Sequence, residues 1–145
     1  MDSQLIADRH PVLGRLFRIW LAGRDGAAMP RAEAIIQCLA DLEDVVVVVF
    51  RPIGSEVAPK IERSGKTVDR LYGIALAGES IGRLTPSSTD AENEAVVVLE
   101  TGRTLMMEDQ VQLPGGPTRI ARLYLPFTDA ADQVGGIIVG ITKAS

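Results

Sequence analysis

The sequence predicts an α+β fold in which helices cover a single antiparallel sheet. The segment from Thr104 to Thr142 contains three apolar-rich runs joined by two turns, which is typical of a β-meander. A helix with its own start and stop signals runs directly into this segment. The chain before that helix contains further helices and two short strands. Helical segments are therefore available to cover the sheet.

Length and composition indicate one domain with its own core. The chain has 145 residues, 46% of them hydrophobic, and a net charge of −4. We expect a single domain over residues 1–145, with an N-terminal helical extension (1–30) and a core (31–145). The acidic balance argues against a nucleic-acid partner. No apolar run approaches the roughly 20 residues of a membrane helix, and no apolar leader is visible, so we expect a cytoplasmic protein without a membrane partner.

An amphipathic helix is predicted to begin at Pro11 and to end near Gly23. Its apolar residues recur at helical spacing on one face, and they are Leu13, Leu16, Phe17, Trp20 and Leu21. The face that contains Leu13, Phe17 and Trp20 has two expected roles. It either packs on the sheet of its own chain or forms the interface of a homodimer. A second helix is predicted to open at Pro30.

The middle of the chain predicts a hairpin and then short helices. Val45–Val49 consists of five β-branched residues, which favours a strand buried on both faces. Lys60–Ser64 is the expected partner strand, followed by a short helix around Tyr72. Thr89 and Glu92 form a capping-box pattern that predicts the start of the helix before the meander, and Gly102 predicts its end.

In the meander, Pro114–Pro117 and Thr128–Gln133 are the predicted turns, and Gly135–Thr142 is the predicted last strand. The strand between the turns alternates imperfectly, because the residues between its most apolar positions are themselves only partly polar. We therefore expect both faces of that strand to be covered.

An ordered set of short motifs resembles the PAS domain, and in particular a bacterial family found largely as small stand-alone PAS proteins. The motifs are Trp20 with Met29–Ala32, Ile61–Val68, Leu71–Gly73 with Gly78, Leu99–Arg103, and Arg122 shortly before Leu125–Pro126. The chain departs from the family pattern at Ile35–Cys38, where an acidic-Pro pair is usual, and at Gly73–Ala75.

The resemblance implies a PAS-like five-stranded antiparallel sheet with short helices on one face and an N-terminal amphipathic helix. It also implies a sensory or regulatory module of bacterial signal transduction, rather than an enzyme. Such a module binds a small ligand, a signalling protein or both. No cofactor is clearly encoded, and the ligand is not specified by the sequence.

A pocket between the sheet and the middle helices is expected to be lined by Arg63, Tyr72, Met107 and Asp109. Glu108 and Asp109 are neighbours on a strand, so their side chains point to opposite faces. Asp109 shares the face of Met107, and if buried it needs a hydrogen-bond donor, for which Arg63 is the expected partner.

The sequence offers little metal or redox chemistry. His10 is the only histidine and stands at a helix start, where we expect it to be solvated. Cys38 is the only cysteine, and we expect it to be buried by packing. Neither residue has neighbours that predict a metal site.

Two other functions stay open at this point. A small cone-shaped α+β enzyme of the ketosteroid-isomerase type would need an acid–base pair in an apolar cavity, with Tyr72 and Asp109 as candidates. A ligand-free dimerisation module would instead have a core filled by its own side chains.

Overall fold

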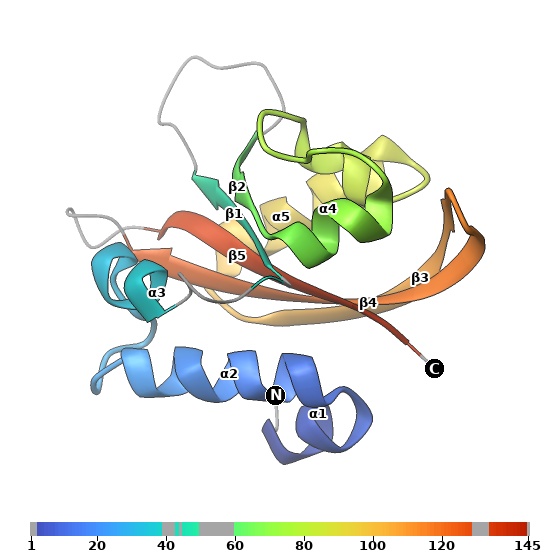
Figure 1. Cartoon of the computed structure of the whole chain (residues 1–145). Coiled ribbons are helices and arrows are strands. Elements are labelled where there is room, and N and C mark those ends of the chain that lie inside the picture. Colours follow the sequence, from blue (N-terminus) through green and yellow to red (C-terminus); the bar gives the residue numbers. More distant parts are fainter. Residues whose placement is uncertain (1–2, 39–42, 44, 50–59, 129–133, 145) are drawn as a thin grey trace.

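The computed structural model describes residues 3–38, 43, 45–49, 60–128 and 134–144. Within these residues one antiparallel sheet has its strands in the order β2-β1-β5-β4-β3 (Figure 1). The α+β class with an antiparallel sheet is confirmed. The elements are α1 (Ser3–Arg9), α2 (Pro11–Gly23), α3 (Ala32–Cys38), β1 (Val45–Val49), β2 (Ile61–Ser64), α4 (Lys66–Tyr72), the 3₁₀ helix η1 (Ile81–Leu84), α5 (Ser88–Thr101), β3 (Leu105–Leu113), β4 (Gly116–Thr128) and β5 (Val134–Lys143).

The sheet lies between two helical layers (Figure 1). The helices α4, η1 and α5 cover one face, and α1, α2 and α3 cover the other. Alternation along β4 supplies both cores, because Ile120 and Tyr124 belong to the first and Leu123 and Leu125 to the second. The prediction that both faces of this strand are covered is confirmed. The separate helix α1 was not predicted.

The valine-rich strand β1 lies in the same sheet as the C-terminal meander. It pairs with β5, with Val45 opposite Gly140, and on its other side with β2, with Val46 opposite Ser64. The predicted hairpin between these two segments is therefore confirmed. The turn predicted over Thr128–Gln133 and the side chain of Cys38 lie outside the described part of the structure, apart from Thr128 itself.

The start of α5 differs from the prediction. The helix begins at Ser88, so Thr89 lies inside it and the predicted capping box is wrong. A hydroxyl from earlier in the chain caps the helix instead, since Thr85 Oγ1 accepts a hydrogen bond from the backbone N–H of Ala91 at 3.1 Å. The predicted end is confirmed, because Gly102 adopts the left-handed conformation with φ of 65°.

The helix α2 packs closely on its own sheet. The side chains of Leu13, Phe17 and Trp20 are 0%, 3% and 4% exposed, so of their two expected roles the structure shows the packing against their own chain. The indole N–H of Trp20 donates to the carbonyl oxygen of Pro126 at 2.8 Å. An added Cβ at Gly140 would overlap Leu16, so glycine at this position lets α2 approach β5.

We predict that Trp20→Phe lowers the free energy of unfolding by about 1–2 kcal/mol, because it removes the hydrogen bond to Pro126 and leaves a buried carbonyl unpaired. Urea denaturation followed by circular dichroism measures this change. Val12→Ala on the same helix is the matched control, since Val12 is exposed, and we expect it to change stability by less than about 0.5 kcal/mol. Equal effects of the two substitutions would contradict the prediction.

Candidate functional site

A wholly buried arginine lies on an inner strand of the sheet, beneath the first helical layer. Arg122 lies on β4 with 0% of its side chain exposed. Its neighbours in the alternation, Ile120 and Tyr124, show that this side chain points toward α5. A guanidinium cannot be deprotonated at ordinary pH, so it has to find anionic partners inside the protein.

The first partner is Asp109 on the neighbouring strand β3. Arg122 Nη1 donates to Asp109 Oδ1 at 2.6 Å, and Arg122 Nη2 donates to Oδ2 at 3.0 Å. This two-pronged contact matches the planar fork of a guanidinium to a carboxylate. The Asp109 side chain is 34% exposed, so it is the point at which the arginine's environment reaches the surface.

The second partner comes from the helical layer. Arg122 Nη2 donates to Glu94 Oε1 at 3.1 Å and to Oε2 at 3.3 Å, and Nε donates to Oε1 at 3.3 Å. The hydroxyl of Tyr124 donates to Glu94 Oε1 at 2.5 Å. We call Glu94, Asp109, Arg122 and Tyr124 the buried ion cluster. It joins α5, β3 and β4.

The protonation states of the cluster follow from burial and from the two carboxylates. Burial opposes the charged form of Arg122, but the hydrogen bond with Asp109 and the charge of Glu94 outweigh it and raise the pKa of the guanidinium. Burial, together with Glu94, raises the pKa of Tyr124, so its hydroxyl keeps its proton. Burial likewise raises the pKa of Tyr72 to about 12.

The sequence placed some of these residues together and missed others. Tyr72 and Met107 belong to the apolar core that surrounds the cluster. The expectation that Arg63 pairs with Asp109 is wrong, because Arg122 holds both carboxylate oxygens and Arg63 is exposed on β2. Glu94 and Tyr124 were not predicted. For Tyr124 the signal is its position two residues after Arg122, which places the side chains of Tyr124 and Arg122 on one face.

Buried side chains pack between the sheet and the helices in the described part of the chain, and they include Tyr72, Ile120 and Val139. The hydroxyl of Tyr72 donates to the carbonyl oxygen of Leu84 at 2.8 Å, which ties α4 to η1. The structure shows a hollow where α4 meets the sheet. It is an open groove of about 500 Å³ between α4, the β3–β4 turn and the end of β5, and we call it the α4 groove.

Solved structures of two domains are similar to this chain over most of its length. A light-oxygen-voltage domain studied with a flavin analogue is 14% identical with a TM-score of 0.58, and the match covers 78% of this chain and 85% of that chain. A PAS domain from Colwellia psychrerythraea is 18% identical with a TM-score of 0.56, and the match covers 75% of this chain and 96% of that one. The chain has the PAS fold.

A third PAS-fold match is longer than this chain. VqmA of Vibrio cholerae, bound to DPO, is 15% identical with a TM-score of 0.57 over 76% of this chain and 56% of that one. The chain thus spans about half the length of VqmA. No protein-family model and no curated protein matches this sequence. The resemblance to PAS domains is confirmed for the fold, and the bacterial stand-alone family remains a prediction.

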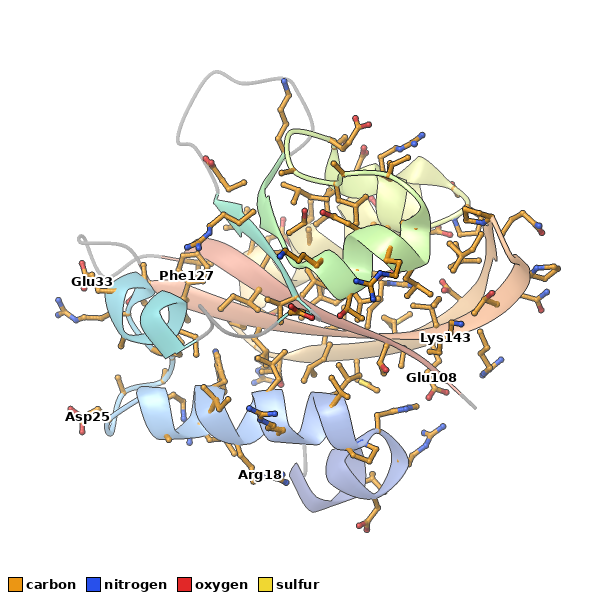
Figure 2. All side chains as sticks on the ribbon, viewed as in Figure 1. Arg18, Asp25, Glu33, Glu108, Phe127 and Lys143 are labelled. Carbon is orange, nitrogen blue, oxygen red and sulfur yellow. The ribbon has the colours of Figure 1, made fainter. Side chains whose placement is uncertain are left out.

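A second charged contact lies on the opposite face of the PAS sheet. Glu108 lies on the side of the sheet that α1 and α2 cover (Figure 2). It accepts a hydrogen bond from Arg9 Nη2 at 2.9 Å, and His10 Nε2 lies 2.5 Å from its other oxygen. The solvated state expected for His10 is wrong, because its side chain is only 6% exposed. The hydrogen bond with His10 lowers the pKa of Glu108 despite partial burial, with help from Arg9 and Arg119.

Two kinds of feature are absent from the described residues. None of the helices there is both long and apolar enough to cross a membrane. In the same part of the chain, no three residues of the metal-binding types gather closely enough to hold an ion.

We predict that Arg122→Met lowers the free energy of unfolding by about 3–5 kcal/mol, because two carboxylates lose their buried cation. Adding Glu94→Gln and Asp109→Asn to Arg122→Met should restore part of the loss, which a thermodynamic cycle from urea denaturation measures. Arg119→Met is the matched control on the same strand, since Arg119 is 58% exposed. If Arg122→Met proves too unstable, Tyr124→Phe should still cost about 1–2 kcal/mol. No recovery in the triple variant would contradict the prediction.

We predict that the contact between Glu108 and His10 stabilises the fold at neutral pH and that this stabilisation is lost at acid pH. A carboxyl whose folded pKa is lowered stabilises the fold above its ordinary pKa of 4.5, and this contribution is lost as the pH falls through the lower folded value. Glu108→Gln should therefore lose less stability than wild type between pH 7 and acid pH. Urea denaturation at several pH values measures this, with the exposed Glu100→Gln as control. Parallel curves for wild type and Glu108→Gln would contradict the prediction.

Proposed function

We propose that the chain is a sensory or regulatory PAS module that binds a small ligand or a signalling protein and passes the event between its helical layer and its sheet. The buried ion cluster is the element that couples α5 of the helical layer to strands β3 and β4 of the sheet. The proposal rests on one observation, the wholly buried Arg122 that holds Glu94 of α5 on one side and Asp109 of β3 on the other.

Stability alone is a weak reason for such a cluster. Replacing a buried ion pair by well-packed apolar side chains is often neutral or stabilising, because the desolvation cost of the charges is large. Charged hydrogen bonds differ from apolar contacts in being directional, so they favour a small number of discrete arrangements. A cluster that joins three elements in this way is suited to report a shift of α5 on the sheet.

The buried side chains between sheet and helices support recognition at the surface of the module. Arg122, Tyr124 and the surrounding apolar side chains occupy the space between sheet and helices. A ligand or partner would then act from outside by favouring one arrangement of the coupled elements over another. The solved PAS-fold neighbours that are described with a flavin analogue or with DPO support the sensory class in general terms.

The geometry lends no support to the enzyme of ketosteroid-isomerase type. Both carboxylate oxygens of Asp109 accept hydrogen bonds from Arg122, so the proposed base is occupied. The hydroxyl of Tyr72, the proposed acid, donates to a backbone carbonyl. The homodimer stays a prediction, and native mass spectrometry tests it.

We predict that Asp109→Asn raises amide hydrogen exchange in both β3 and α5, because Asp109 anchors Arg122, which in turn holds Glu94. Hydrogen-exchange mass spectrometry measures the effect for each element. Glu108→Gln is the matched control, since it changes the neighbouring residue whose contacts lie on the opposite face. It should loosen α1 and leave α5 unchanged. An Asp109→Asn variant with wild-type exchange in α5 would contradict the proposed coupling.

The same measurement tests sensing directly. Small metabolites that raise the melting temperature are expected to change exchange in α5 and β3 together in the wild type. In Asp109→Asn the change should be confined to the element that contacts the ligand. Stabilising ligands that leave both α5 and β3 unchanged in the wild type would contradict the proposal.

A further inference from the structure

The α4 groove is built from both the helical layer and the sheet. Val68 and Leu71 come from α4, Leu113 from the end of β3, and Ile141 from β5. Figure 1 shows the β3–β4 hairpin curving toward α4 on the side of the sheet that this helix covers. Val68, Leu113 and Ile141 are buried in the core, so the floor of the groove is held in place without a ligand, while Leu71 is half-buried and Pro114 is exposed.

The charged side chains that line the groove have one sign. Arg70 on α4 and Lys143 at the end of β5 both line it, and none of the described residues that line it is acidic. The chain as a whole carries a net charge of −4, whereas both charged side chains that line the groove are positive. Lys143 follows Ile141 by two residues on β5, which places both on the same face of the sheet.

We infer that the α4 groove binds a small organic anion with an apolar body, of the size of a medium-chain carboxylate. Its volume of about 500 Å³ lies within the usual range for small-molecule sites. The apolar body would lie over the exposed Pro114 and the half-buried Leu71, with Val68 and Ile141 beneath them, and the anionic group would lie between Arg70 and Lys143. A guanidinium fork and an ammonium group are the side chains that proteins use for carboxylates.

The inference deepens the proposed function, on which it rests, by naming a ligand class and a place for it. The groove and the buried ion cluster are separate sets of residues. Binding in the groove and coupling through the cluster can therefore succeed or fail independently. Octanoate binding reports on the groove, and the exchange response of α5 and β3 reports on the coupling.

The test uses octanoate as the probe and the whole chain as the protein. Two-dimensional NMR titration is expected to shift amides of α4, the β3–β4 turn and the end of β5. Octylammonium has the same apolar body and the opposite charge, and we expect it to bind at least about fivefold more weakly. Equal binding of the two probes, or shifts centred on other elements, would overturn the inference.

Three substitutions locate the probe. Lys143→Gln and Arg70→Gln should each weaken octanoate binding by about fivefold, because each removes one cation near the carboxylate. Gly115→Leu should weaken it by a similar or larger factor. Gly115 lines the groove, and a Cβ added there would have no other atom within 4 Å, so we expect the fold to tolerate a side chain at this position.

The matched control is Arg63→Gln, which removes an exposed arginine outside the groove. It should leave octanoate binding unchanged. If Arg63→Gln weakens binding as much as Lys143→Gln does, the effect belongs to net charge and the inference is overturned. Asp109→Asn should keep octanoate binding and lose the joint response of α5 and β3. Octanoate bound in the wild-type groove without that response would contradict the proposed coupling while leaving the site intact.

Discussion

The structure depends on satisfying one positive charge that no water reaches. Arg122 lies on the inner strand β4 with its whole side chain buried. Its desolvation is offset only if every side of the guanidinium finds a partner. Glu94 of α5 and Asp109 of β3 are those partners, and the hydroxyl of Tyr124 holds Glu94 in place. The position of α5 over the sheet is therefore set by directional hydrogen bonds as well as by apolar packing.

The strand β3 gains most from this arrangement. Among the described strands it is an edge strand that pairs with β4, so its backbone hydrogen bonds to the sheet lie along one side. Two neighbouring carboxylates on β3 add side-chain contacts that hold the strand to the rest of the structure. Asp109 binds Arg122 beneath α5, and Glu108 binds His10 and Arg9 beneath the N-terminal helices. Because adjacent side chains point to opposite faces, one short segment fastens β3 to both helical layers.

How far the fold could be read from the sequence depended on how local each signal is. The spacing in α2, the glycine after α5 and the meander are local patterns, and the structure contains all three. The capping box was wrong because two matching letters do not decide which residue begins a helix. The hydroxyl that accepts the bond from Ala91 belongs to Thr85, outside the pattern.

The candidate site was harder, because its contacts join residues far apart in the chain. The reasoning that separated the faces of Glu108 and Asp109 was local, and the contacts agree with it. The partner of Asp109 was not local, since Arg122 lies thirteen positions away across a hairpin whose register the sequence leaves open. The same limit explains His10, whose burial depends on the unpredicted helix α1 and on a strand nearly a hundred residues later.

The groove and the ion cluster share one strand, which connects recognition to coupling in physical terms. Leu113 lines the groove, and Asp109 precedes it by four residues on β3, so both side chains lie on the same face. The distance between them along the strand is roughly 13 Å. A ligand held against Leu113 bears on the end of an edge strand, and the next charged contact on that face is the pair of Asp109 and Arg122. Any displacement of β3 therefore has to stretch this pair or carry Arg122 and Glu94 with it, and α5 moves in the second case.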